Sequence, residues 1–110
     1  MIILIADDDR LVRFTMKSML MEILSWGEHL YLEAGNGEEL RQLCRNYRPD
    51  IVFTDIRMPV MDGIEFARQL REKDKRVKII FLTGYDEMDF IRQAFRLSAT
   101  DYILKPFLVE

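Results

Sequence analysis

The sequence predicts a doubly wound α/β domain built on a five-stranded parallel β-sheet. Short apolar runs alternate along the chain with segments whose apolar residues recur at helical spacing, which is the pattern of successive βαβ units. The apolar runs are continuous rather than alternating, as expected for strands that helices cover on both faces. With 110 residues, 49% of them hydrophobic, the chain is long enough for one domain with a real core.

The first predicted strand and helix lie at residues 2–6 and 10–24. Residues 2–6 are apolar throughout, and Asp9 is placed to cap the helix that follows. One face of that helix is predicted to carry Val12, Met16, Met19, Leu20 and Ile23. Residues 30–32 form a weaker strand signal.

The next helix begins at a capping signal. Asn36 is a favoured N-cap residue, and an acid stands three residues later at Glu39. The i, i+3, i+4, i+7 positions of this helix are Leu40, Leu43, Cys44 and Tyr47. Pro49 closes the helix, and residues 51–53 form the third strand.

The second half of the chain continues the same alternation. A helix after Gly63 is marked by Ile64, Ala67 and Leu70. Residues 77–82 form the fourth strand and residues 102–104 the fifth. Between those two strands, a helix is marked by Met88, Ile91, Ala94 and Phe95.

Composition excludes several classes of function. The net charge is −3 and no block of Lys and Arg occurs, which argues against nucleic-acid binding. The chain has one cysteine, Cys44, so it forms no intrachain disulfide and suits a reducing compartment. The apolar run at residues 2–6 is too short for a signal peptide or a membrane span. We therefore expect a cytoplasmic protein that contacts neither a membrane nor nucleic acid.

Four of the five predicted strands are followed by polar or charged residues. These are Asp7, Asp8 and Asp9 after the first strand, Asp55 after the third, Thr83 and Gly84 after the fourth, and Lys105 and Pro106 after the fifth. A single Asp after a strand is most often a turn residue or a helix cap. In a parallel sheet, however, these ends meet at one edge, where such folds bind ligands. The combination therefore indicates a functional site.

A cluster of carboxylates at one edge is costly unless a cation sits in it. Hard oxygen ligands suit Mg²⁺, with Mn²⁺ as the alternative, whereas the His and Cys ligands of a zinc site are missing. Lysine and threonine would then contact phosphoryl oxygens, and Gly84 would leave room for the group. One carboxylate would act as a nucleophile and form an aspartyl phosphate.

Four motifs together make the chain similar to response-regulator receiver domains of two-component signalling. They are LIADDDR at residues 4–10, PDIVFTDIRMPVMDGIEF at 49–66, IIFLTGYDEMDF at 79–90 and ATDYILKPF at 99–107. The resemblance covers the whole chain, residues 1–110, as one receiver domain. It implies a flavodoxin-like fold with strand order 2-1-3-4-5.

The resemblance also implies a role for each acid. Asp55 would be the phosphoacceptor, Asp8 would bind Mg²⁺ directly, and Asp7 would bind it mainly through water. The backbone carbonyl of Arg57 would complete the protein's share of the metal shell. The domain would be a switch rather than an enzyme with turnover.

The remaining implied residues handle the phosphoryl group and transmit its presence. Thr83 would hydrogen-bond the phosphoryl group and Lys105 would pair with it, before a cis peptide bond to Pro106. Thr83 would move on phosphorylation and Tyr102 would turn inward, which shifts the population between two packings.

Pro59 and Gly63 would hold the loop after the phosphorylation site. The implied partner is a sensor histidine kinase, with specificity on the helix around residues 11–19. The motifs are most similar to receivers that precede AraC-type helix-turn-helix regions, which suggests control of transcription by an output DNA-binding domain that is not in this chain.

Receivers normally carry a fifth helix after the Lys-Pro turn, and here only residues 107–110 follow. We therefore expect a receiver that ends before that helix, which could hide its uncovered face in a homodimer.

Two alternatives remain at this point. One is a Mg²⁺-dependent phosphatase with an Asp nucleophile, although the Asp-x-Asp motif of such enzymes is absent, because Arg57 stands where the second acid would be. The other is a pseudo-receiver that binds partners without being phosphorylated, although such proteins usually lack one of the acids or the lysine.

Overall fold

A computed structural model describes residues 1–25, 27–56, 58–59, 63–83 and 101–104, with the backbone alone for Thr83 and the last of these ranges. The elements in chain order are β1 (Ile2–Ala6), α1 (Arg10–Ile23), β2 (Leu30–Ala34), α2 (Gly37–Tyr47), β3 (Ile51–Asp55), α3 (Gly63–Lys73), β4 (Lys78–Thr83) and β5 (Asp101–Leu104). The helix predicted around residues 88–95 lies outside the described residues.

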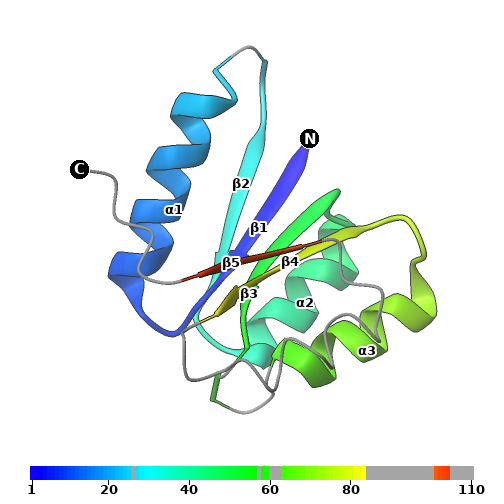
Figure 1. Cartoon of the computed structure of the whole chain (residues 1–110). Coiled ribbons are helices and arrows are strands. Elements are labelled where there is room, and N and C mark those ends of the chain that lie inside the picture. Colours follow the sequence, from blue (N-terminus) through cyan, green and yellow to red (C-terminus); the bar gives the residue numbers. More distant parts are fainter. Residues whose placement is uncertain (26, 57, 60–62, 84–100, 105–110) are drawn as a thin grey trace.

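The strands form one parallel sheet in the order β2-β1-β3-β4-β5. This order confirms the predicted topology, in which β1 and β3 lie next to each other at the centre. The order in which strands are added reverses after β2, because β2 lies on one side of β1 and β3 on the other. The loops that follow β1 and β3 therefore emerge side by side at the carboxyl edge. Figure 1 shows α1 on one face of the sheet and α2 and α3 on the other.

The two faces of the strands fill two separate cores. Leu4, Val52 and Phe81 point into the core under α2 and α3, which also contains Leu40 and Phe66. Their sequence neighbours point the other way, because successive strand residues alternate between faces. Ile3, Ile5, Phe53 and Leu82 therefore pack against Met16 of α1. Continuous apolar strands thus serve both cores, as the sequence predicted.

Both predicted helix caps are confirmed. The side chain of Asp9 accepts a hydrogen bond from the Leu11 N–H at 2.9 Å. The side chain of Asn36 accepts one from the Glu39 N–H at 2.9 Å, and Glu39 in turn accepts from the Gly35 N–H at 2.8 Å. The bonds from Leu11 and Glu39 satisfy donors that a helix start leaves without a partner within the helix, and the bond from Gly35 ties the preceding residue to the first turn of α2.

Some details of the predicted elements were wrong. β2 continues for two residues past the predicted end at residue 32, and β3 includes Asp55 as its last residue. Ile23 and Tyr47, expected on buried helix faces, are 65% and 44% exposed. Both stand at the last residue of their helix, where no element in the described part of the chain covers the apolar face.

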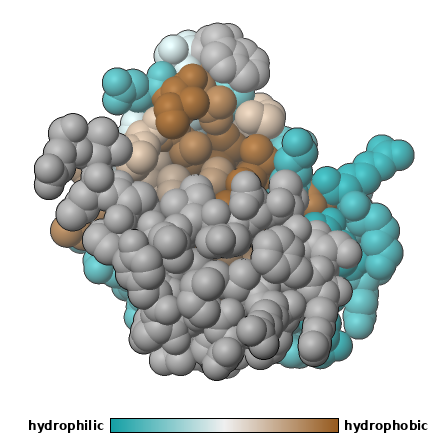
Figure 2. Space-filling model, in the orientation of Figure 1, coloured by the Kyte–Doolittle hydropathy of each residue, from teal (hydrophilic) through white to brown (hydrophobic). Residues whose placement is uncertain are grey.

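The α1 side of the sheet is less fully covered than the α2–α3 side within the described residues. Partly buried side chains around its core include Leu20, Leu24, Tyr31, Ile51 and Ile80. Hydrophobic side chains gather in the upper part of the molecule in the view of Figure 2, above the grey residues. None of the helices in the described part of the chain has the length and apolar character needed to cross a membrane.

Candidate metal and phosphoryl-transfer site

Three carboxylates from two adjacent strands meet at the carboxyl edge of the sheet. Asp7 and Asp8 follow β1, and Asp55 is the last residue of β3. One carboxylate oxygen from each lies within 4.8 Å of the others. Asp7 and Asp55 are 0% and 4% exposed, whereas Asp8 is exposed. The structure therefore brings together three acids that the sequence separates by almost fifty positions.

Such a cluster is electrostatically costly when it is empty of cations. At 4.8 Å, two carboxylates repel by roughly 3 kcal/mol at an effective dielectric near 20, and two of these three are buried. The donor set is three hard oxygens with an exposed side at Asp8, which fits an ion that keeps part of its water shell. Mg²⁺ has these preferences and Mn²⁺ shares them. The residues present therefore fit the predicted metal.

Asp7 is held in place by its neighbours on α1. Its Oδ1 accepts a hydrogen bond from the Asp9 N–H at 2.9 Å. Its backbone carbonyl accepts one from Nη1 of Arg13 at 2.6 Å, and Nε of Arg13 donates to Glu33 of β2 at 3.2 Å. The Arg13 side chain is only 17% exposed. Sequence analysis missed this residue, since an arginine in an amphipathic helix carries no signal of where its side chain bonds.

Asp55 is fixed through its backbone from two sides. The buried hydroxyl of Thr54 donates to the Asp55 carbonyl at 3.0 Å. Gly63, the first residue of α3, packs against the same carbonyl so closely that a Cβ at Gly63 would lie 2.1 Å from the oxygen. The Gly63 N–H also donates to the Ile56 carbonyl at 2.7 Å. The chain therefore leaves Asp55, returns to pack against the Asp55 carbonyl at Gly63, and then continues as α3.

Pro59 and Gly63 were both predicted to hold the loop after β3. Pro59 is exposed, and its carbonyl accepts a hydrogen bond from the Gly37 N–H at the start of α2, at 3.3 Å. The loop is thus tied to α2 at one point and to the end of β3 at another.

The other predicted site residues are described in part or not at all. Strand register pairs Asp55 with Leu82, and Thr83, the next residue of β4, pairs with Leu104. The Thr83 backbone therefore lies at the same edge of the sheet as Asp55, and the Tyr102 backbone lies on the adjoining strand. Outside the described residues lie Arg57, Gly84, Lys105 and Pro106.

The chain matches a known family of domains along nearly its whole length. The family model of the response regulator receiver domain matches residues 3–110. The chain is a member of the receiver domain family.

Curated relatives of this receiver domain are bacterial regulators. The chain is 42% identical over 112 residues to the sensory transduction protein LytT of Oceanobacillus iheyensis, covering 98% of this chain and 43% of LytT. It is 35% identical to the transcriptional regulatory protein PdtaR of Mycobacterium tuberculosis, over 98% of this chain and 51% of that protein. The receiver domain thus spans about half the length, or less, of these relatives.

A solved structure shows the same fold. The receiver domain of AraT, a response regulator from Geobacillus stearothermophilus, matches with a TM-score of 0.86 and 37% identity, over 96% of this chain and 81% of that chain. These findings confirm the predicted family and the flavodoxin-like architecture. A receiver belongs to a two-component system, so a histidine kinase is its implied partner, and the domain is of a kind that typically accepts a phosphoryl group without being an enzyme.

Proposed function

We propose that this receiver is a phosphorylatable signalling switch in which Asp55 accepts a phosphoryl group from a sensor histidine kinase in a Mg²⁺-dependent reaction. The observation that carries the proposal is the position of Asp55. It is a buried carboxylate at the end of a central strand, with oxygens of Asp7 and Asp8 within 4.8 Å. A buried acid in an acidic cluster has little use in a structural role, because removing it would relieve repulsion.

The proposed reaction is a phosphoryl transfer between two protein side chains. A carboxylate oxygen of Asp55 attacks the phosphorus of a phosphohistidine, an O–P bond forms as the P–N bond breaks, and the imidazole leaves with the electron pair and takes up a proton. A Mg²⁺ ion held by Asp7, Asp8, Asp55 and the Arg57 carbonyl would offset the negative charge on the phosphoryl oxygens. Thr54 and Gly63 contribute by fixing the Asp55 backbone, so that the nucleophile keeps one orientation.

The output half of the proposal rests on the family resemblance. Thr83 and Lys105 would contact the phosphoryl group, Gly84 and Pro106 would shape access to it, and Tyr102 would change rotamer with phosphorylation. Residues 80–83 of β4 pair with residues 101–104 of β5, so a change at Thr83 can reach Tyr102 on the adjacent strand. The relatives named as transcriptional regulators support an output in transcription. The similarity of the motifs to receivers that precede AraC-type regions favours a DNA-binding output domain of that type.

The start of α1 supports a docking surface for the kinase, and the proposed switch would act in the cytoplasm. Leu11 and Phe14 are 70% and 66% exposed and lie three residues apart, so they share one side of the helix. This side stands next to the acidic edge, since α1 begins at Arg10, two residues after Asp8. Replacing both apolar residues with serine should block transfer from a kinase that phosphorylates the native chain, while a small phosphodonor still works. Unchanged transfer from the kinase would refute this surface.

The decisive experiment measures intact mass after incubation with phosphoramidate, with and without Mg²⁺. The native chain should gain one phosphoryl group only with Mg²⁺, and Asp55→Asn should gain none. Asp9→Asn is the matched control, because it makes the same change at a neighbouring exposed acid and keeps the capping oxygen. It should be phosphorylated like the native chain.

Each other outcome points to a specific alternative. An adduct that persists in Asp55→Asn would assign a different acceptor. A folded native chain that gains no adduct would be a pseudo-receiver. Steady turnover of p-nitrophenyl phosphate would identify the phosphatase alternative.

A further inference from the structure

A second concave site lies between α2 and α3, at the opposite end of the sheet from the acidic cluster. The cavity has a volume of about 490 Å³, within the range of small-molecule sites. It is lined by the second half of α2, by α3 from Phe66 to its end, and by Pro49, just before β3. Parallel strands place their starts at one edge and their ends at the other, so this site cannot share residues with Asp7 or Asp55.

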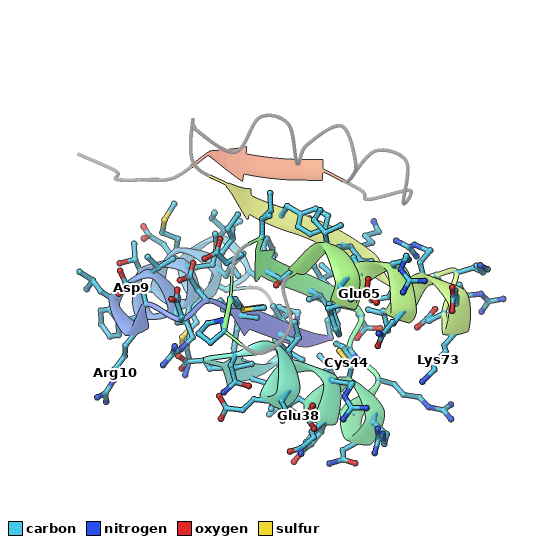
Figure 3. All side chains as sticks on the ribbon, turned by 90° about the horizontal axis from the view of Figure 1, so that it is seen from below. Asp9, Arg10, Glu38, Cys44, Glu65 and Lys73 are labelled. Atoms are coloured by element: carbon cyan, nitrogen blue, oxygen red, sulfur yellow. The ribbon has the colours of Figure 1, made fainter. Side chains whose placement is uncertain are left out.

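The lining combines an apolar floor with a rim that is mostly basic and includes one acid, Asp74. Phe66 and Cys44 are 2% and 9% exposed, and Leu70 is partly buried beside them. Arg45 and Lys73 line the rim from the last turns of α2 and α3. In Figure 3, Cys44 lies between the two helices and Lys73 stands at the end of α3. In a chain with a net charge of −3, four cationic side chains and one carboxylate therefore line a single hollow, which leaves an excess of positive charge there.

The rim cations are available to a ligand. Neither Arg48 nor Lys73 forms an ion pair or a side-chain hydrogen bond with any residue in the described ranges. Arg45 forms no ion pair there either, although its charge helps to lower the pKa of Glu38. By contrast, Arg41 is held by Glu38 at 2.7 Å. The negative ends of the helix dipoles account for cations at these C-termini, but not for the hollow between the helices or for the left-handed backbone of Arg48.

Arg48 occupies a backbone conformation that suits glycine better. It is the C-cap of α2, with φ 50° and ψ 69°, and it is the one non-glycine residue with positive φ in the described part of the chain. Glycine is usual at such a left-handed cap, because a side chain there is strained. A strained backbone that places a cation at the rim of a cavity is a feature that stability alone does not favour.

We propose that the cavity between α2 and α3 binds a small organic anion with an apolar body. The body would lie on Phe66, Leu70 and Cys44, and a sulfonate, phosphate or carboxylate head would bond with Arg45, Arg48 and Lys73. The Cys44 thiol acts only as an apolar surface, because burial, together with the charge of Asp74, raises its pKa to about 12.

In the test, 2-naphthalenesulfonate is titrated into the 110-residue chain without Mg²⁺, and binding is followed by the change in amide chemical shifts. A sulfonate is chosen because it does not mimic a reacting phosphoryl group. With about fourteen non-hydrogen atoms, it should bind with a Kd of about 1 mM or tighter. Shifts should cluster at residues 44–49 and 66–74. Methanesulfonate and 2-naphthalenemethanol, which each carry half of the probe, should bind at least tenfold more weakly.

Two variants separate a ligand site from charges that only complement helix ends. Arg48→Gly should raise the Tm by a few degrees, because strain is relieved, and yet weaken probe binding at least about fivefold. Lys73→Gln should weaken binding similarly, and Lys75→Gln, a nearby cation outside the lining, should not.

Any of three results would overturn the proposal. The chemical shifts could change at the acidic edge instead, the half-probes could bind as tightly as the whole probe, or both Arg48→Gly and Lys73→Gln could bind the probe with native affinity. None of these results depends on phosphorylation of Asp55, so the two proposals succeed or fail separately.

Discussion

Gly63→Ala tests how closely the site depends on the start of α3. No described glycine has a positive φ, so Gly63 is required for space and not for backbone freedom. An added Cβ would lie 2.1 Å from the Asp55 carbonyl oxygen, 3.1 Å from its carbonyl carbon and 3.2 Å from the Ile56 Cα. All three are backbone atoms, so no side chain can rotate away to relieve the clash.

The size of the effect follows from that geometry. Ordinary contact begins near 3.4 Å, so α3 and the end of β3 must separate by about 1.3 Å, the difference from 2.1 Å. Overpacking of this kind costs about 1–3 kcal/mol, and the higher helix propensity of alanine offsets less than about 1 kcal/mol. We expect a net loss of about 1–2 kcal/mol and a Tm lowered by about 4–10 °C. A displacement near 1 Å at the nucleophile should also slow phosphorylation by about a hundredfold.

Two assays on the purified variant measure these effects. Urea unfolding gives the stability change, and the rate of adduct formation with phosphoramidate gives the effect on the site. Gly27→Ala is the matched control, since its Cβ would meet only the His29 ring at 3.5 Å, an ordinary contact. A Gly63→Ala protein with native stability and a native phosphorylation rate would refute the reasoning, because it would show that the backbone at Asp55 yields without cost.

Four further predictions concern three single side chains. Asp9→Ala removes the cap of α1 and should cost about 0.5–2 kcal/mol in urea unfolding, whereas Asp9→Asn should cost much less; equal losses would contradict a capping role. Arg13→Met removes the donor to the Asp7 carbonyl and should weaken Mg²⁺ binding several-fold in calorimetric titration; native affinity would show that Arg13 does not position Asp7. Cys44 should react with iodoacetamide at pH 8 far more slowly in the folded chain than in urea, because burial raises its pKa to about 12. The raised pKa means that the folded state binds the thiol proton more tightly than the unfolded state does. The contribution of Cys44 to the free energy of unfolding is therefore complete below the unfolded pKa near 9, and it is lost as pH rises from 9 towards 12, by at most about 1.4 kcal/mol per pH unit. A free energy of unfolding that stays constant over this window would contradict the raised pKa.

The sequence by itself determined the strands, the caps and the edge that carries the acids. Continuous apolar runs that alternate with helical periodicity favour strands covered by helices on both faces, and residues 2–6 and 51–53 were assigned on that ground. Asp9 and Asn36 bond to residues two or three positions away, and such local bonds are visible in a linear sequence. The parallel topology then requires that Asp7, Asp8 and Asp55 share an edge.

What the tertiary structure alone decided involves contacts between elements. Helical periodicity predicted that Ile23 lies on the buried face of its helix. Burial, however, also requires a neighbouring element that reaches this position, and none in the described part of the chain does so. Gly63 fitted a turn in the sequence, and its close approach to Asp55 exists only once α3 packs on β3. The bond from Arg13 to Asp7, and the hollow that Arg48 lines, likewise join segments that no local pattern connects. Short-range hydrogen bonds and apolar periodicity are encoded within a few residues, whereas steric contact and charge convergence arise only when distant segments occupy the same space.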